Sequence, residues 1–459
     1  MVNNMKIWIN KCVEEKRIEG FENSIVFNIN IPGKGGILTS DIRRGWYYEL
    51  GVQGVSSICE DLYIIALSVF AADKRVPRSI TSDGWTRNFD LSIPVIELDK
   101  WNYVCKDIEK MLSYLSGDIW TISFRRCSIE NRYKDDHKRP SKKNMDLQSF
   151  EAVSLFSGGM DSYCGAYEMI SQDKKIMLVG NKEYGGLDNI QKELLEHITQ
   201  NLKDNGSLFF SFSARAYQPL YSDFSKSENT SRSRSLLFLS AAICIADLIG
   251  DNTPVFIPEN GFIGLNLPLT ASRKGSCSTR TTHPYFLKSL NSILSKIGIK
   301  HCISNPYAFL TKREMVQNLK DLDGFLDKIH LTISCSHPKN GRWKGDSEPS
   351  NCGYCYPCLI RQSSLLDLSL PQDKYKTINA ISYDHYLNGT NDTRSDLVDL
   401  ISSVALAKKS TDQEILKRIR GTGHLNSDES KKFLRLYKQS IDDLYEMFSK
   451  DPKLKAIME

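Results

Sequence analysis

The sequence predicts an α/β protein built around a doubly wound parallel sheet. From residue 152 onward, short apolar runs alternate with segments of helical periodicity. The runs suited to buried parallel strands are residues 152–156, 176–179, 208–212 and 255–257. Helical segments lie between them, an amphipathic one at 190–202 and a more fully apolar one at 236–249. This rhythm predicts a right-handed doubly wound sheet, in which ligands bind outside the carboxyl ends of the strands.

Size and composition indicate a globular protein of two or three domains. At 459 residues the chain exceeds one ordinary core, and 41% hydrophobic with 25% charged residues is typical of soluble proteins. The longest apolar run, 236–249, contains Asp247 and is too short to span a bilayer. The chain opens without a basic and apolar leader, so we expect a cytoplasmic protein with no membrane partner. A net charge of +5 permits contact with nucleic acid without requiring it.

The N-terminal stretch, residues 1–130, is expected to form an α+β domain of unassigned role. Alternation of apolar and polar residues from Phe27 to Ile31 predicts a half-buried strand. Two further strands and one helix are expected at 62–70, 119–124 and 101–115, in that order. No residues in this stretch have catalytic spacing.

Two segments flank the central domain, which is expected at 151–370. Residues 131–150 are polar and basic and contain a proline, which favours a solvated linker over a nucleic-acid site because few aromatic residues accompany the charges. Residues 371–459 are expected to form a helical extension. Its two apolar stripes predict packing rather than function; they comprise Leu397, Leu400, Ile401 and Val404, and Phe433, Tyr437, Ile441, Leu444 and Phe448.

A glycine turn with the sequence SGGMDS, residues 157–162, follows the first predicted strand and precedes a helical segment. This order aims backbone N–H groups and a helix N-terminus at one point, which is a site for an anion. Gly158 and Gly159 permit close backbone approach, and Ser157 and Ser162 add hydroxyl donors. The turn lacks the lysine of the GxxxxGK[ST] loop, so it is not that of ordinary NTPases. The alternative is a plain serine–glycine turn in a doubly wound sheet.

Three cysteines stand at CxxCxxC spacing, Cys352, Cys355 and Cys358, and Cys335 lies upstream across a polar loop. Tight CxxC turns point thiolates at one ion, and a fourth thiolate from a distant loop completes a closed tetrahedron. The spacing therefore predicts a structural Zn²⁺ site. An iron–sulfur cluster is the main alternative, and His337 is the alternative to Cys335 as fourth ligand.

The SGGMDS turn resembles the pyrophosphate loop of the PP-loop ATP pyrophosphatases, which have a HUP-like fold and cleave ATP to AMP and pyrophosphate. Together with the cysteine segment, 335–358, and Arg361, it resembles the 7-cyano-7-deazaguanine synthase (QueC) family. The helix that begins at Arg234 and the KREM segment that begins at Lys312 are similar to two further segments of that family. The resemblance covers about residues 153–365.

This resemblance implies ATP, Mg²⁺ and Zn²⁺ as cofactors and a small deazapurine carboxylate as substrate. Members of the family adenylate 7-carboxy-7-deazaguanine, and ammonia then displaces AMP to give an amide; a second round gives the nitrile. The amides of Gly158, Gly159 and Met160 are expected to hold the leaving pyrophosphate. The residues expected to position or neutralise phosphates and Mg²⁺ are Ser157, Asp161, Ser162, Arg234 and Lys312. For Arg234 and Lys312 the alternative is solvated surface.

The chain departs from the family where the substrate segment is expected. Glu259 and Asn260 directly follow a predicted strand, and Arg273, Arg280 and His283 lie on a hydroxyl-rich loop. We expect these residues to line a polar substrate pocket; the alternative is a solvated loop. The departure puts a free nitrile product in doubt, because the adenylate can instead be passed to an amine on a partner protein.

With its added N-terminal domain, the chain resembles the QueC-like proteins of Qat-type bacterial anti-phage systems. That resemblance implies a defence role beside an ATPase and a nuclease-like partner. Two alternatives stay open: a PP-loop enzyme that modifies tRNA, and a non-catalytic subunit that senses nucleotides or deazapurines. A tRNA enzyme calls for an RNA-binding module and a sulfur-relay cysteine, and the N-terminal stretch contains no recognisable RNA module.

Overall fold

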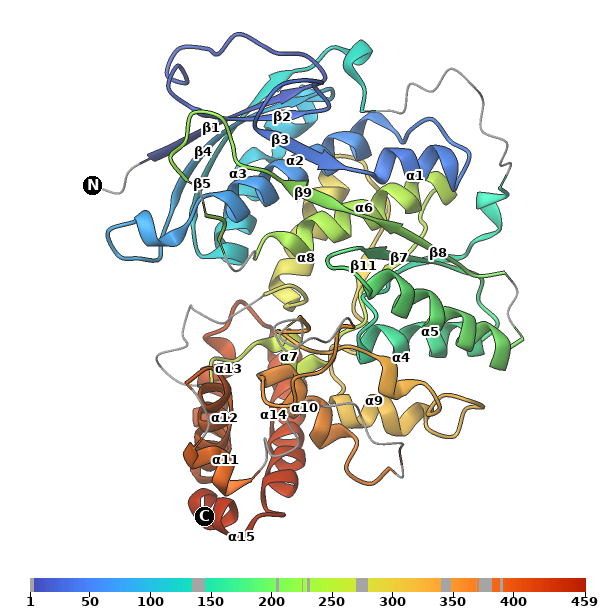
Figure 1. The fold of residues 1–459 in the computed structure, drawn as a ribbon, viewed down its shortest axis with the longest axis vertical. Coiled ribbons are helices and arrows are strands. Elements are labelled where there is room, and N and C mark those ends of the chain that lie inside the picture. Colours follow the sequence, from blue (N-terminus) through green and yellow to red (C-terminus); the bar gives the residue numbers. More distant parts are fainter. Residues whose placement is uncertain are drawn as a thin grey trace.

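The computed structural model describes residues 4–133, 145–203, 206–224, 226–228, 232–269, 280–339, 348–368, 370, 382–388 and 391–459, with the backbone alone at 385 and 391–395. Its strands form two sheets, and a group of helices lies at the C-terminal end (Figure 1). Most of the predicted linker, 134–144, is outside the described residues, so the domain boundaries stay predictions. Among the described helices, none combines the length and the apolar character that a membrane span requires.

The second sheet is parallel throughout and confirms the predicted doubly wound α/β fold. Its strand order is β11-β10-β6-β7-β8, and Val153 pairs with Met177 on one side and Val255 on the other. Its strands are β6 (Ala152–Leu155), β7 (Ile176–Asn181), β8 (Leu208–Phe212), β10 (Val255–Phe256) and β11 (Ile303–Ser304). The strand order reverses between β6 and β10, which makes their carboxyl ends the switch point where such sheets bind ligands.

Helices flank this sheet, and the helix after the glycine turn and those that overlap 190–202 and 236–249 lie where the sequence predicts them. The apolar run at 236–249 lies in a helix that is buried along nearly its whole length. The flanking helices are α4 (Met160–Ser171), α5 (Leu187–Asn201), α6 (Arg234–Ile249) and α8 (Pro284–Lys296).

The five strands of the N-terminal region follow the same relative order as the second sheet, which the sequence did not reveal, and a strand from residues 214–216 is added at one edge of the sheet. Its order is β5-β4-β1-β2-β3-β9, and all pairs except β3 with β9 are parallel. The strands are β1 (Asn4–Lys11), β2 (Ile25–Ile29), β3 (Ile37–Ser40), β4 (Asn88–Val95), β5 (Ile119–Arg126) and β9 (Ala214–Ala216). At the switch point of this sheet, where β1 ends, an internal ion pair occupies the position of a ligand. Lys11 pairs with Glu60 at 2.7 Å, and both side chains are fully buried.

One predicted strand of this region is wrong. Residues 62–70 belong to the helix α2 (Ser57–Arg75). The helix is buried on nearly all sides, so its apolar run carries no amphipathic period, and a short buried run of this kind reads equally as a strand. The helix at 101–115 and the strand at 119–124 are confirmed as α3 (Leu98–Ser116) and β5.

The helices α2 and α6 pack against each other between the two sheets (Figure 1). The N–H and hydroxyl of Ser56 donate to Asp247 at 2.8 and 3.0 Å, which joins the start of α2 to α6. Both sheets share one apolar core across this contact. The remaining short elements of this part are α1 (Ile42–Tyr48), η1 (Arg78–Ile80), η2 (Ile129–Asn131) and η3 (Leu147–Ser149).

The C-terminal extension is helical, as predicted, and both apolar stripes are buried. They form a second core together with three of the cysteines. Capping boxes start two of the helices, at Thr411 with Glu414 and at Asn426 with Glu429. The remaining elements after α6 are α7 (Gly261–Leu265), α9 (Lys312–Leu319), η5 (Ile329–Leu331), α10 (Tyr356–Ser364), α11 (Tyr383–Asn388), α12 (Asn391–Lys409), α13 (Asp412–Arg420), α14 (Ser427–Phe448) and α15 (Pro452–Met458).

Candidate functional site

The SGGMDS turn connects β6 to α4 at the switch point of the second sheet. Gly158 has φ of +77°, a conformation that side chains rarely adopt, and a Cβ at this residue would lie within 3.2 Å of α5 side chains. Gly159 is the N-cap of α4, so the first amides of the helix, which have no carbonyl partner within the helix, face the turn. The hydroxyls of Ser157 and Ser162 lie 3.1 Å apart, and Ser162 also donates to the Gly159 carbonyl at 2.9 Å. The turn therefore offers amides, hydroxyls and a helix N-terminus to one anion.

Asp161 joins two predicted site residues that are far apart in the sequence. Its Oδ1 forms an ion pair with Lys312, the first residue of α9. Its Oδ2 accepts hydrogen bonds from the side chain of Asn260 at 2.8 Å and from the Asn260 N–H at 3.2 Å. Lys312 is buried, so the alternative of a solvated surface lysine is excluded.

Glu259 lies beside this group. Its backbone is held by Asn305, which accepts from the Glu259 N–H at 3.2 Å and donates to its carbonyl at 2.8 Å. The hydroxyl of Thr282 donates to the Glu259 carboxylate. Burial raises the pKa of Glu259 to about 7, and the nearby Asp161 charge adds to that rise.

A cavity of about 280 Å³ opens at the carboxyl ends of β6, β7, β8 and β10. Ser157, Ser162, Arg234 and Glu259 contribute its polar lining from the predicted site. Its apolar walls suit a flat ring; they consist mainly of Leu155, Phe156, Val179, Leu187, Phe212, Phe238, Ile257 and Pro258. The cavity thus combines an apolar slot with the anion-binding turn.

Arg234 opens α6 and forms an ion pair with Glu183 across the cavity lining. The two side chains are 42% and 44% exposed, so solvent reaches both of them. A phosphate that enters the cavity therefore competes with the Glu183 carboxylate for the Arg234 guanidinium.

The structure does not bring Arg280 and His283 into the cavity. Arg280 donates to the carbonyl of Tyr114 at 2.6 Å and stacks on its ring at 4.4 Å. His283 is fully buried; its Nδ1 accepts from the Tyr285 N–H and its Nε2 lies 2.9 Å from the Thr422 hydroxyl. Burial lowers the pKa of His283 to about 3, so the ring is neutral. Both residues join parts of the fold, and Arg273 lies outside the described residues.

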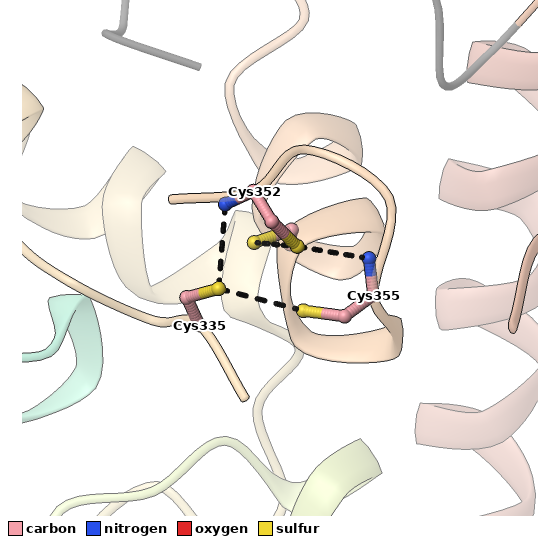
Figure 2. Close-up of side chains that lie close together, drawn as sticks. Cys335, Cys352 and Cys355 are labelled. Atoms are coloured by element: carbon pink, nitrogen blue, oxygen red, sulfur yellow. Dashed lines mark hydrogen bonds between the residues drawn. The ribbon is translucent and has the colours of Figure 1, made fainter. Parts of the chain in front are cut away.

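The four cysteine sulfurs gather at one point, all within 4.8 Å of one another. Figure 2 shows Cys335, Cys352 and Cys355 with their sulfurs turned toward a common centre. The sulfurs of Cys335 and Cys355, and those of Cys352 and Cys358, are 3.9 Å apart. Zn–S bonds of about 2.3 Å in a tetrahedron place sulfurs about 3.8 Å apart, so these residues fit one zinc ion.

The alternatives to this ligand set fit less well. A four-iron cluster has its core between its thiolates and needs them further apart. His337 is exposed, stacks on the ring of Tyr354, and contributes only its backbone N–H, which donates to the Cys335 sulfur at 3.2 Å. The geometry therefore favours four thiolates around a single ion.

Two functional residues that sequence reasoning missed connect the cysteines to the glycine turn. The hydroxyl of Ser334 accepts from the Met160 N–H at 3.2 Å, and the Ile333 N–H donates to the Gly158 carbonyl at 2.9 Å. Asn351 accepts from the Ser334 N–H at 3.0 Å. Ser334 and Asn351 each directly precede a cysteine of the cluster, and that shared position is the signal in the sequence that could have found them.

Arg361 supports the segment that precedes Ser334. It is fully buried and donates to the Thr332 hydroxyl and to the Ile329 carbonyl, the latter at 2.7 Å. The side chain of Asn351 donates to the Thr332 carbonyl at 3.0 Å. Arg361 is thus a structural part of the motif rather than a cavity residue.

A sequence model of the family described as "Queuosine biosynthesis protein QueC" matches residues 281–369, a span that holds Lys312, Arg361 and the four cysteines. The chain has a QueC-like PP-loop domain. The 7-cyano-7-deazaguanine synthase of Leptospira interrogans is 26% identical over 266 residues, which is 53% of this chain and 98% of the relative. That of Pyrococcus furiosus is 26% identical over 260 residues, or 50% and 97% of the two chains.

These relatives are named as synthases, so the expectation of an enzyme is confirmed at the level of the family. They match the QueC-like unit over nearly their whole length while covering about half of this chain. This protein therefore carries a large addition to the unit that it shares with them.

Proposed function

We propose that this protein is an ATP-dependent ligase that adenylates the carboxylate of a 7-deazapurine and releases pyrophosphate. One observation carries the proposal: Ser157 and Ser162 of the SGGMDS turn line one cavity with Arg234 at the switch point. Asp161 of the same turn forms an ion pair with Lys312. The QueC-like match supports the deazapurine as substrate class.

The reaction begins when a carboxylate oxygen of the substrate attacks the α-phosphorus of ATP. The bond to the β-phosphate breaks, and pyrophosphate leaves. The amides of Gly158, Gly159 and Met160 and the charge of Lys312 stabilise the negative charge on the leaving group. Asp161 with the hydroxyls of Ser157 and Ser162 offers the oxygen ligands that Mg²⁺ prefers, and a bound Mg²⁺ neutralises phosphate charge.

The second half of the reaction transfers the activated acyl group to nitrogen. An amine attacks the carbonyl carbon, the carbon–oxygen bond to AMP breaks, and the amine loses a proton. Glu259 lines the cavity, and its pKa of about 7 suits a group that accepts this proton near neutral pH. The amine is either ammonia or an amine on a partner protein. The anti-phage setting and its ATPase and nuclease-like partners are predictions of the sequence resemblance alone.

Thiolation of tRNA, the alternative, has less support. The lining of the cavity in the described part of the chain includes no cysteine to carry sulfur.

The test is mass spectrometry of the products after incubation with ATP, Mg²⁺, 7-carboxy-7-deazaguanine and ammonia. We expect AMP and pyrophosphate in equal amounts, together with an amide or nitrile of the deazapurine. Production of ADP, or no change in the carboxylate while ATP is cleaved, would contradict the proposal. A variant with Tyr103→Ala, on the exposed face of α3, serves as the matched control because this residue is 72% exposed.

A further inference from the structure

The segment that enters α6 contributes two arginines to the cavity lining, Arg232 and Arg234. We propose that the N-terminal region, residues 4–133, is a positioning element that sets these arginines for the phosphates of ATP. This inference rests on the proposed function and gives the N-terminal region a role in it. The sequence motifs point to Arg234 but not to Arg232.

The first contact fixes the start of α6. Ser233 is the N-cap of α6, and Asp73 of α2 accepts hydrogen bonds from its N–H at 2.9 Å and from its hydroxyl at 2.8 Å. A carboxylate at a helix N-terminus is favourable, and here it belongs to the N-terminal region. Arg234 is the next residue, so this contact sets where its side chain leaves the backbone.

Asp73 is itself held in place. Its Oδ1 pairs with Arg87 at 2.5 Å, and Arg87 also pairs with Asp118 at 2.7 Å. Arg87 and Asp73 are fully buried, and burial acts to raise the pKa of Asp73 while the Arg87 charge holds it below its ordinary value. The carboxylate that caps α6 is therefore charged and fixed.

The second contact holds Arg232. Its guanidinium lies over the ring of Trp85, 4.5 Å from the centroid, and donates to the carbonyl of Ser116 at 3.1 Å. Both partners belong to the N-terminal region, in the loop before β4 and at the end of α3. Burial lowers the pKa of Arg232 to about 10, so the group stays charged at neutral pH. A stacked guanidinium with a carbonyl partner keeps its orientation.

The third contact docks the described residues that precede the arginines. The Glu228 N–H donates to the Lys74 carbonyl at 2.8 Å, and the Glu228 carboxylate accepts from the Arg78 N–H at 2.9 Å. The chain that leads into α6 is therefore held at two places. Before the arginines, Glu228 contacts α2 and η1, and at the N-cap Ser233 contacts α2. Arginines that are oriented before the ligand arrives lose less conformational entropy on binding.

The test measures equilibrium binding of α,β-methylene-ATP with Mg²⁺ by titration calorimetry. This analogue cannot be cleaved between its α- and β-phosphates. Trp85→Ala removes the stacking surface under Arg232 without removing a cavity residue. We expect it to weaken binding about five- to tenfold, and Trp85→Phe to restore most of the loss. Tyr103→Ala, a change of an exposed aromatic residue in the same region, leaves the affinity unchanged.

A double variant separates positioning from a general loss of stability. If Trp85 acts through Arg232, then Trp85→Ala adds little to the loss caused by Arg232→Ala, because the two side chains act as one unit. Wild-type affinity in Trp85→Ala, or losses that add in the double variant, would overturn the inference alone. Failure of the wild-type protein to bind the analogue would overturn the proposed function, and the inference with it.

Discussion

The hydroxyl of Ser334 accepts a hydrogen bond from the N–H of Met160, and the two atoms are 3.2 Å apart. Met160 is the first residue of α4, so its N–H belongs to the anion site of the glycine turn. Ser334 directly precedes Cys335, a ligand of the expected metal. The cysteine cluster and the turn are thus neighbouring parts of one unit.

Ser334→Ala is expected to slow pyrophosphate release about five- to tenfold, because one neutral hydrogen bond contributes about 1 kcal/mol. The metal content of the variant stays as in the wild type, since no ligand is changed. A coupled pyrophosphate assay and metal analysis measure the two quantities. Ser336→Ala, an exposed hydroxyl two residues away, is the control; equal rates in both variants would remove Ser334 from the site.

The Asp161–Lys312 pair allows stability and activity to be separated. Asp161→Asn leaves Lys312 buried with a charge that has lost its partner, which costs about 3 kcal/mol or more. The double variant Asp161→Asn, Lys312→Met removes both charges, so we expect the thermal midpoint to recover. Pyrophosphate release is expected to fall about 100-fold or more in both variants. Recovery of activity together with stability in the double variant would show that the pair only supports the fold.

Metal analysis is expected to give one zinc ion per chain. Cys352→Ser removes a ligand, so the variant loses the metal and melts at a lower temperature. Cys302 is exposed and lies outside the cluster, which makes Cys302→Ser the matched control with full metal content. Since Ser334 and Asn351 link the cluster to the turn, the metal-free protein is also expected to bind α,β-methylene-ATP more weakly. Iron in place of zinc, or no metal, would contradict the assignment.

The pH dependence tests the role of Glu259. Its pKa is raised from 4.5 to about 7, so between these pH values the folded protein holds a proton that the unfolded chain has lost. The contribution of Glu259 to stability is present below about pH 4.5 and is lost as the pH rises to about 7. Transfer to the amine needs the ionised carboxylate, so the rate is expected to rise with pH and level off above about 7. The Glu259→Gln variant is expected to be slow at every pH. If this variant keeps the pH–rate profile of the wild type, Glu259 is not the base.

Local patterns predicted four strands of the second sheet, because each is a short apolar run closed by a turn. The flanking helix α5 has an amphipathic period, and the apolar run of α6 is too long for a strand. The order β6, glycine turn and α4 is encoded within about twenty residues, and so is the cysteine cluster at 352–358. The buried helix α2 was read as a strand because a helix covered on all sides shows no amphipathic period.

Other features depend on distant contacts that no local pattern encodes. Arg280 and His283 have the chemistry of anion donors, yet packing against Tyr114 and Thr422 places them elsewhere. Two further examples join residues far apart in the sequence. One is the parallel pairing of strands in the N-terminal sheet, and the other is the hydrogen bond from Ser233 to Asp73. Ser334 carries no motif of its own, and only its position beside Cys335 connects it to the site.

We expect the glycine turn to hold the pyrophosphate part of ATP. A crystal structure of the protein with α,β-methylene-ATP and Mg²⁺ tests it most directly. We expect the β- and γ-phosphates to accept hydrogen bonds from the amides at 158–160, with Lys312 beside them. A triphosphate bound elsewhere in the cavity, away from these amides, would contradict it.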